Sequence, residues 1–127
     1  MGLSVSQAEL AGMPPSRAMS EKALQTCVID TARILGWRVA HFRSVPVKRG
    51  PRVVWETPVQ ADGAGFPDLV LVRDRVLWLE LKVGANTLSQ SQAEWARALR
   101  DAGEEFYVWT EHDWHNGIVE TTLRRQA

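Results

Sequence analysis

The chain has 127 residues, and its 15 Lys and Arg residues balance its 15 Asp and Glu residues, so that the formal net charge is zero. One domain is expected at this length. A hydrophobic content of 45% with 24% charged residues excludes a wholly disordered, collagen-like or coiled-coil chain. The absence of an overall basic excess argues at first against a nucleic-acid-binding protein.

Cys27 is the single cysteine, which excludes an internal disulfide and a cysteine-rich zinc site. This fits a reducing compartment, and we predict a cytoplasmic protein. No apolar run approaches the ~20 residues that a membrane span needs, and the first residues lack the apolar core of a signal peptide. We therefore expect no membrane partner, and we also expect no nucleotide cofactor.

The first elements can be predicted in chain order. Residues 1–19 contain two adjacent prolines and small polar residues, which predicts a flexible N-terminal arm. Ser20 is a suitable N-cap for a helix over residues 21–35, whose apolar residues recur at helical spacing. Gly36 ends this helix, and residues 37–42 alternate as in a strand.

Prolines and glycines interrupt residues 43–67, which predicts a long loop with room for a short hairpin around residues 53–55. The apolar runs 68–72 and 76–83 predict two strands joined as a β-hairpin. Residues 89–102 show helical periodicity and end before a glycine.

A fourth strand is predicted over residues 105–110, and residues 112–125 are ambiguous, with a short helix expected at their end. The element order is therefore α-β-β-β-α-β. A right-handed crossover places the third and fourth strands in parallel. We predict a single α/β domain over residues 20–127, with a four-stranded mixed sheet flanked by helices.

The chemically informative residues lie on the predicted hairpin. Alternation along its second strand places Glu80 and Lys82 on one face and leucines on the other. Asp68 opens the neighbouring strand, so its carboxylate can lie beside Glu80. Two converging carboxylates suit Mg²⁺ or Mn²⁺, and Lys82 can orient a water or contact a phosphate. The alternative, an exposed salt-bridged strand, is weaker because Glu and Lys are disfavoured in strand interiors.

Several motifs resemble those of a known nuclease superfamily. Pro67-Asp68 and Glu80-Leu81-Lys82 match the motif that gives the PD-(D/E)XK superfamily its name. The VRR-Nuc family, the virus-type replication-repair nucleases, is matched further by Ser20-Glu21 with Gln25, by Gly65-Phe66-Pro67-Asp68, and by Leu88-Ser89 with Gln92. The resemblance covers roughly residues 20–115. It implies a restriction-endonuclease-like αβββαβ core.

The resemblance also implies roles for individual residues. Five would be catalytic: Glu21, Asp68, Glu80, Lys82 and Gln92. Asp68 and Glu80 would hold Mg²⁺ or Mn²⁺ together with the backbone carbonyl of Leu81, and Glu21 would complete the acidic pocket directly or through water. Lys82 would act on the attacking water, and Gln92 would support the site. Gln92 also fits a capping box with Ser89, and an acidic residue suits a first helical turn.

Stand-alone members of that family look like homodimeric nucleases that cut branched DNA, including four-way (Holliday) junctions. We therefore expect a Mg²⁺- or Mn²⁺-dependent, structure-selective endodeoxyribonuclease of a phage or prophage replication-repair system. Two alternatives remain open. One is a restriction-like endonuclease on duplex DNA, and the other is a non-catalytic DNA-binding module that assists recombination.

The neutral total conceals two opposed blocks of charge. Six basic and no acidic residues lie between Arg33 and Arg52, and six acidic and no basic residues lie between Asp101 and Glu120. The basic block leads into the loop before Asp68, where a phosphate backbone would approach the carboxylates; the alternative is a solvated surface. DNA contacts are expected from Arg38, Arg43, Lys48, Arg49 and Arg52, with Trp55 as a candidate for stacking on a base or packing on a partner.

Overall fold

The structure is a computed structural model, and it describes residues 18–42, 45–56 and 59–127. The predicted N-terminal arm lies outside the described residues except for Ala18 and Met19. Met19 packs against the main hydrophobic core. The core domain therefore begins just before the first predicted helix.

Helix α2 spans Glu21–Ile34, close to its predicted limits. The Oγ atom of Ser20 caps it by accepting a hydrogen bond of 3.0 Å from the backbone N–H of Ala23. Gly36 follows the helix with a φ of +92°, a conformation that favours glycine. Strand β1, Arg38–His41, begins directly after this turn.

The central sheet contains four strands in the order β1-β4-β5-β6. Strands β4, Leu69–Val72, and β5, Val76–Leu81, form the predicted antiparallel hairpin, and β1 pairs antiparallel with β4. Strand β6, Glu105–Trp109, runs parallel to β5. The predicted four-stranded mixed sheet flanked by helices is therefore confirmed, and β5 occupies an interior position.

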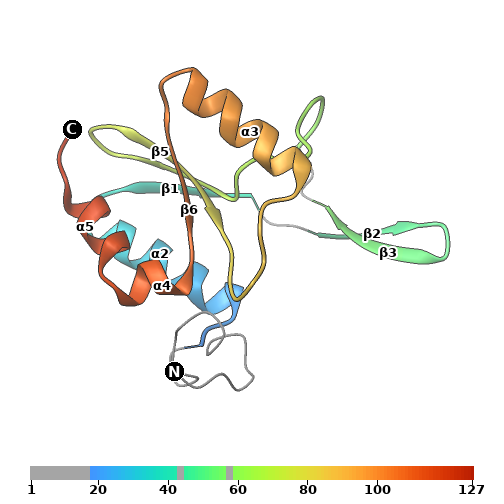
Figure 1. The fold of residues 1–127 in the computed structure, drawn as a ribbon, viewed down its shortest axis with the longest axis horizontal. Helices are drawn as coiled ribbons and strands as arrows, with labels where there is room; N and C mark the ends of the chain where they lie inside the picture. Colours follow the sequence, from blue (N-terminus) through green and yellow to red (C-terminus); the bar gives the residue numbers. More distant parts are fainter. Residues whose placement is uncertain (1–17, 43–44, 57–58) are drawn as a thin grey trace.

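Helices cover both faces of the sheet (Figure 1). On one face, α2 and α5, Ile118–Arg124, pack on the leucines of β4 and β5. The buried residues of this core are Leu24, Val28, Ala32, Trp37, Leu69, Leu71, Leu77, Leu79, Leu81, Trp109, Val119 and Leu123. On the other face, α3, Gln90–Asp101, buries Ala96 and Leu99 against Phe106, with Trp78 packed beside them.

The C-terminal region forms two helices where the sequence indicated one short helix. Helix α4, Glu111–His115, starts directly after β6, and α5 follows after Gly117. Gly117 has a φ of +80° and separates the two helices. The buried side chains of Val119 and Leu123 explain why the final segment is ordered on the sheet.

The stretch predicted as a long loop contains a second, two-stranded sheet. Strands β2, Val45–Arg49, and β3, Arg52–Glu56, pair antiparallel along their whole length. Figure 1 shows this hairpin projecting sideways from the central sheet and its helices. The short hairpin expected around residues 53–55 is therefore present but longer, because alternating valines support it despite Pro46.

Within the described residues, no helix has the length and apolar character needed to cross a membrane.

Candidate active site

Asp68 and Glu80 meet at the open end of the β4–β5 hairpin. The register pairs Leu69 with Leu79, so Asp68 and Glu80 follow as the next cross-strand positions on a shared face. The Oδ2 atom of Asp68 accepts a hydrogen bond of 3.2 Å from the backbone N–H of Leu81. This bond holds the Asp68 carboxylate against the end of β5, next to Glu80.

Glu80 is a buried carboxyl group, with 2% of its surface exposed. It lies on the face of the sheet that α3 covers, where the Nε2 atom of Gln92 donates a 3.1 Å hydrogen bond to Glu80 Oε2. Burial raises the pKa of Glu80 to about 9, and a hydrogen bond to Asp68 acts in the same direction. The raised pKa favours the protonated form of Glu80 at neutral pH.

Glu21 and Lys82 approach the same two carboxylates. Burial and the negative charge of Asp68 raise the pKa of Glu21, which stands in the first turn of α2. The ammonium group of Lys82 opposes the rise in pKa at both Glu21 and Glu80. The backbone N–H of Lys82 donates to the carbonyl oxygen of Trp109 at 3.0 Å, which fixes Lys82 just past the end of β5. Three acidic groups and one ammonium group thus share one end of the sheet.

Gln92 has two functions in this structure. Its Oε1 atom accepts a 2.9 Å hydrogen bond from the backbone N–H of Ser89, while Ser89 Oγ accepts one of 3.2 Å from the backbone N–H of Gln92. These bonds form the predicted capping box of α3. The remaining amide group, Nε2, reaches Glu80. The same side chain therefore starts the helix and fixes the buried carboxyl group.

The loop before Asp68 is packed directly on the start of α3. Gly65 has a φ of +79°, and a Cβ atom at this position would lie 2.4 Å from the carbonyl carbon of Ser91. Phe66 makes edge-to-face contacts with Phe42, Trp78 and Trp95, at centroid distances of 5.1, 6.0 and 5.0 Å. The anchoring role of Phe66 was missed by the sequence analysis, although a large aromatic residue among small loop residues was the available signal.

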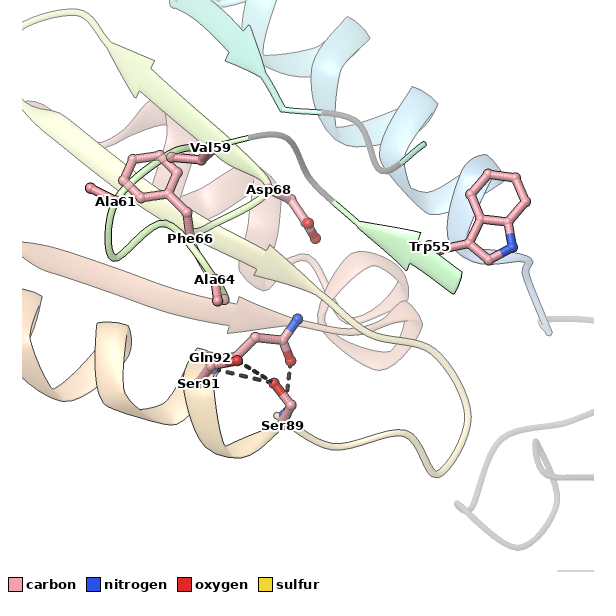
Figure 2. Close-up of a pocket in the computed structure, with 10 residues that line it drawn as sticks. Trp55, Val59, Ala61, Ala64, Phe66, Asp68, Ser89, Ser91 and Gln92 are labelled. Atoms are coloured by element: carbon pink, nitrogen blue, oxygen red, sulfur yellow. Dashed lines mark hydrogen bonds between the residues drawn. The ribbon is translucent and has the colours of Figure 1, made fainter. Parts of the chain in front are cut away.

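Two cavities flank Asp68. One, of about 460 Å³, lies against the start of α3 and is lined in part by Ser89, Ser91 and Gln92. The other, of about 570 Å³, lies toward α2 and β1 and is lined by Glu21, Lys22, Gln25, His41, Phe42, Trp55 and Asp68. Trp55 and Asp68 belong to both cavities. Figure 2 shows the Asp68 carboxylate pointing into the space between Trp55 and the start of α3.

The residues predicted to bind DNA are divided between two places. Lys48, Arg49 and Arg52 lie at the tip of the β2–β3 hairpin. Arg38 stands opposite Val72, at the end of β1 that is remote from Asp68, and the structure does not bring it to the site. Arg43 lies outside the described residues. At the near end of β1, the ring of His41 contacts the side-chain amide of Gln25.

The donor atoms at the site suit a hard divalent cation. In the described part of the chain, no group of three or more His, Cys, Asp and Glu side chains is arranged to hold a metal ion. Asp68 and Glu80 offer two carboxylates at facing cross-strand positions, and the charge of Asp68 raises the pKa of Glu80. A divalent cation would offset their mutual repulsion, because carboxylate oxygens are the ligands that Mg²⁺ and Mn²⁺ prefer. The two carboxylates therefore fit the implied metal.

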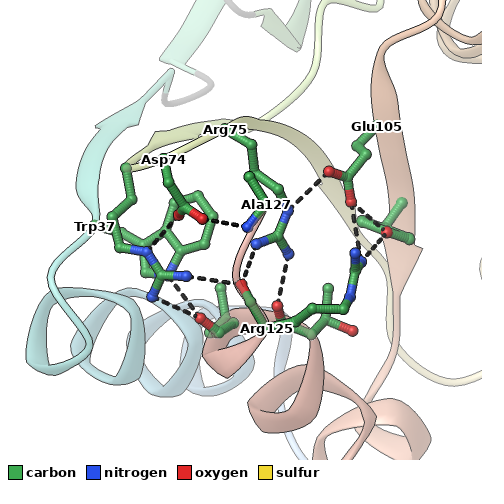
Figure 3. Close-up of polar contacts among 10 residues, drawn as sticks. Trp37, Asp74, Arg75, Glu105, Arg125 and Ala127 are labelled. Atoms are coloured by element: carbon green, nitrogen blue, oxygen red, sulfur yellow. Dashed lines mark hydrogen bonds and ion pairs between the residues drawn. The ribbon is translucent and has the colours of Figure 1, made fainter.

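A second polar cluster lies at the opposite end of the β4–β5 hairpin. Arg73 and Arg75 stack on the Trp37 ring, with guanidinium carbons 4.4 and 5.2 Å from its centroid. Their N–H groups donate to the C-terminal carbonyl oxygens, including those of Leu123 and Thr122 at 3.0 and 2.7 Å. Figure 3 shows Arg75 between the C-terminal segment and Glu105. This cluster fastens the end of the chain to the sheet.

Two members of the acidic block are used internally, Glu105 near the turn of the hairpin and Glu111 near its open end. Glu105 pairs with Arg75 and Arg125, at 2.8 and 3.2 Å. Glu111 is 5% exposed, and its carboxylate accepts hydrogen bonds from the backbone N–H of Gly84. These acidic side chains stabilise the fold at positions away from the Asp68 cavities.

No protein-family model, curated protein or solved structure matches this chain. The resemblance to the VRR-Nuc family therefore depends on the motif residues themselves.

Proposed function

We propose that the protein is a Mg²⁺- or Mn²⁺-dependent endodeoxyribonuclease that hydrolyses phosphodiester bonds in branched DNA, with four-way junctions as its substrate. One observation carries the proposal. Asp68 and Glu80 meet across the open end of the β4–β5 hairpin beside Lys82 and Gln92, and Asp68 lines both cavities. Strongly perturbed carboxyl groups next to a cleft are typical of catalytic sites.

The metal would be held by Asp68 and Glu80. The family resemblance adds the backbone carbonyl of Leu81 and, directly or through water, Glu21. A divalent cation in such a place stabilises negative charge on the phosphoryl oxygens and lowers the pKa of water. The closely spaced carboxylates support this assignment, because they repel one another unless a proton or a cation lies between them.

The remaining groups would prepare the nucleophile and the site. Lys82 provides a positive charge beside the carboxylates, where it orients the attacking water and lowers the cost of removing its proton. Gln92 fixes the orientation of the Glu80 carboxyl group through its Nε2 hydrogen bond. Because Gln92 is itself held by the Ser89 N-cap, this orientation is set before substrate binds.

DNA as the partner is supported by the basic tip of the β2–β3 hairpin, formed by Lys48, Arg49 and Arg52. Basic side chains on a projecting element suit a phosphate backbone and predict binding that weakens steeply with salt. A four-way junction is two-fold symmetric and needs paired cuts, so two copies of a chain with one such site form a suitable homodimer. A nuclease of this kind would act in the cytoplasm, in a bacterial host if it is encoded by a phage.

The proposal is tested by incubating the protein with nicked, flapped, linear and four-way DNA in the presence of Mn²⁺ or Mg²⁺. We expect preferential cutting of branched DNA, and loss of cleavage by about 10²–10⁴-fold in Glu80→Ala, Asp68→Ala and Lys82→Ala. Asp101→Ala, which changes an exposed acidic residue at the end of α3, is the matched control. Circular dichroism should show that each variant is folded.

Three results would contradict this assignment. Cleavage by Glu80→Ala at the wild-type rate would show that Glu80 does not take part in catalysis. Fixed-sequence cutting of linear duplex would favour the restriction-like alternative. DNA binding without turnover on any substrate would favour the non-catalytic module, against which the intact Asp68, Glu80 and Lys82 argue.

A further inference from the structure

The two faces of the β2–β3 hairpin differ in character. Its register pairs Pro46 with Trp55 and Lys48 with Val53, and alternate pairs share a face. Trp55 and Val53 are 69% and 62% exposed, which is unusual for large apolar side chains. A hairpin of two strands is marginally stable by itself in water. This exposed face is therefore suited to contact with a partner that offers both apolar surface and negative charge.

Charge identifies the partner as a nucleic acid. The β2–β3 hairpin contains three basic residues and one acidic residue, Glu56, at its base. The basic residues gather at the tip, and the indole of Trp55 lies nearer the base of the same hairpin. The basic tip of the hairpin suits the phosphates of a nucleic acid strand, and the indole of Trp55 suits the face of a base.

The position of Trp55 relative to Asp68 indicates which part of the DNA it meets. The cavity against α3 and the cavity against α2 have Trp55 and Asp68 in common. A strand that passes from one cavity to the other therefore crosses Asp68 with Trp55 beside it. Ser89 and Ser91 provide hydroxyl groups on one side of this path, and Lys22 and His41 provide polar groups on the other.

We propose that the strand bound at Asp68 is locally unpaired, and that one of its bases stacks on Trp55. This inference rests on the proposed nuclease function and identifies the substrate feature that the site selects. In a regular duplex each base face is covered by its neighbours, so an indole gains a stacking partner only where pairing and stacking are interrupted. Branch points, flaps and bulges have such bases, and stacking on an aromatic side chain accepts any sequence.

Binding should be measured on the full wild-type chain in EDTA, with fluorescence anisotropy of a labelled single strand, the matched duplex and a duplex with a central bulge. We expect Trp55→Ala to weaken binding of the single strand and the bulged duplex about 5- to 150-fold. Duplex binding should stay unchanged, and Trp55→Phe should retain most of the affinity. Ile34→Ala is the control, because Ile34 is 83% exposed at the end of α2, lies outside the β2–β3 hairpin and lines neither cavity.

A second readout detects the stacking itself. A 2-aminopurine base in the bulge should lose fluorescence when the wild-type chain binds and regain it with Trp55→Ala. Equal losses of affinity for duplex and single strand, unchanged affinity, or quenching that persists in Trp55→Ala would overturn the proposal. So would a change of oligomeric state in Trp55→Ala by light scattering, which would assign this face to a second copy of the chain.

The two proposals fail separately in these experiments. If Trp55 governs binding of unpaired DNA but no substrate is cut with Mn²⁺, the nuclease assignment fails and the stacking surface stands. If branched DNA is cut and Trp55→Ala neither binds nor cuts it more weakly, the nuclease assignment stands and the stacking surface is wrong.

Discussion

The pKa values of acidic side chains shift in opposite directions at the two ends of the β4–β5 hairpin. At the turn, a hydrogen bond from Arg73 lowers the pKa of Asp74 to about 2. Partial burial favours the neutral form of Glu105, but hydrogen bonds from Tyr107 and the charge of Arg75 outweigh it and lower its pKa. At the open end, burial raises the pKa of Glu80 to about 9 and also raises that of Glu21.

This difference separates a part of the molecule that stabilises the fold from the part where we propose a metal site. Ion pairs at the turn make the charged forms of the acids favourable in the folded state. At the open end, burial and neighbouring carboxylates make the charged forms of Glu80 and Glu21 unfavourable. The same two strands therefore carry both a structural clamp and a candidate metal site, at opposite ends of the hairpin.

The largest expected effect comes from the open end, where Gly65 touches the backbone of α3. Gly65→Ala places a methyl group 2.4 Å from the Ser91 carbonyl carbon and adds the strain of a positive φ. We expect the free energy of unfolding to fall by about 2–5 kcal/mol, measured by urea denaturation. Gly103→Ala is the control, because its φ is +86° but a Cβ there meets nothing within 4 Å. Equal losses in the two variants would show that the close approach is unimportant.

An intermediate effect is expected at the turn. Arg75→Ala removes the hydrogen-bond donors to Glu105 and to the carbonyl oxygen of Thr122. The loss of the guanidinium group also leaves Glu105 with less positive charge nearby. We expect a loss of about 1.5–3 kcal/mol in the free energy of unfolding, with Mn²⁺ affinity unchanged by calorimetry. Arg124→Ala is the control, since its pair with Glu120 joins two largely exposed side chains. A weakened Mn²⁺ affinity in Arg75→Ala would contradict the separation of the two ends.

The smallest effect, for a change of one pH unit, is the dependence of the free energy of unfolding on pH. Folded Glu80 keeps a proton that the unfolded chain releases above the ordinary glutamate pKa of 4.5, so stability from this group declines as pH rises toward about 9. In EDTA, we expect the free energy of unfolding to fall by up to about 1.4 kcal/mol per pH unit between pH ~5.5 and ~8. The turn acids are already ionised in this range, because their pKa values are lowered.

Two conditions sharpen the comparison of the ends over this pH range. Glu80→Gln removes the titrating group and should flatten the profile relative to wild type. If the proposed metal site is correct, Mg²⁺ or Mn²⁺ should also reduce the decline. If the wild-type chain and Glu80→Gln had the same dependence of unfolding free energy on pH in EDTA, Glu80 would be ionised in the folded state.

The sheet and the meeting of its acidic residues could be predicted because both follow from local patterns. Alternation along β5 assigns Leu77 and Leu79 to one face and Glu80 to the other, and a hairpin with a short turn brings Asp68 opposite Glu80. The capping box of Ser89 and Gln92 was predictable for the same reason, since its partners are three residues apart.

Features that depend on distant contacts could not be predicted. The β2–β3 hairpin contains Pro46 and ends at a Gly-Pro turn, signals that favour a loop when they are counted locally. The two C-terminal helices are explained by contacts of Leu123 and Val119 with the core. The remote position of Arg38 follows from strand direction, because β1 runs toward the site and Arg38 is its first residue.

Gln92 joins the buried carboxyl group of Glu80 to the backbone amide of Ser89, the N-cap of α3. One side-chain amide accepts from the Ser89 N–H and donates to Glu80, so no water or loop intervenes between the two. If Glu80 binds a cation as proposed, the change in charge would polarise this amide and would reach the Ser89 N–H. The NMR chemical shift of the Ser89 backbone amide would then report whether the proposed metal site is occupied.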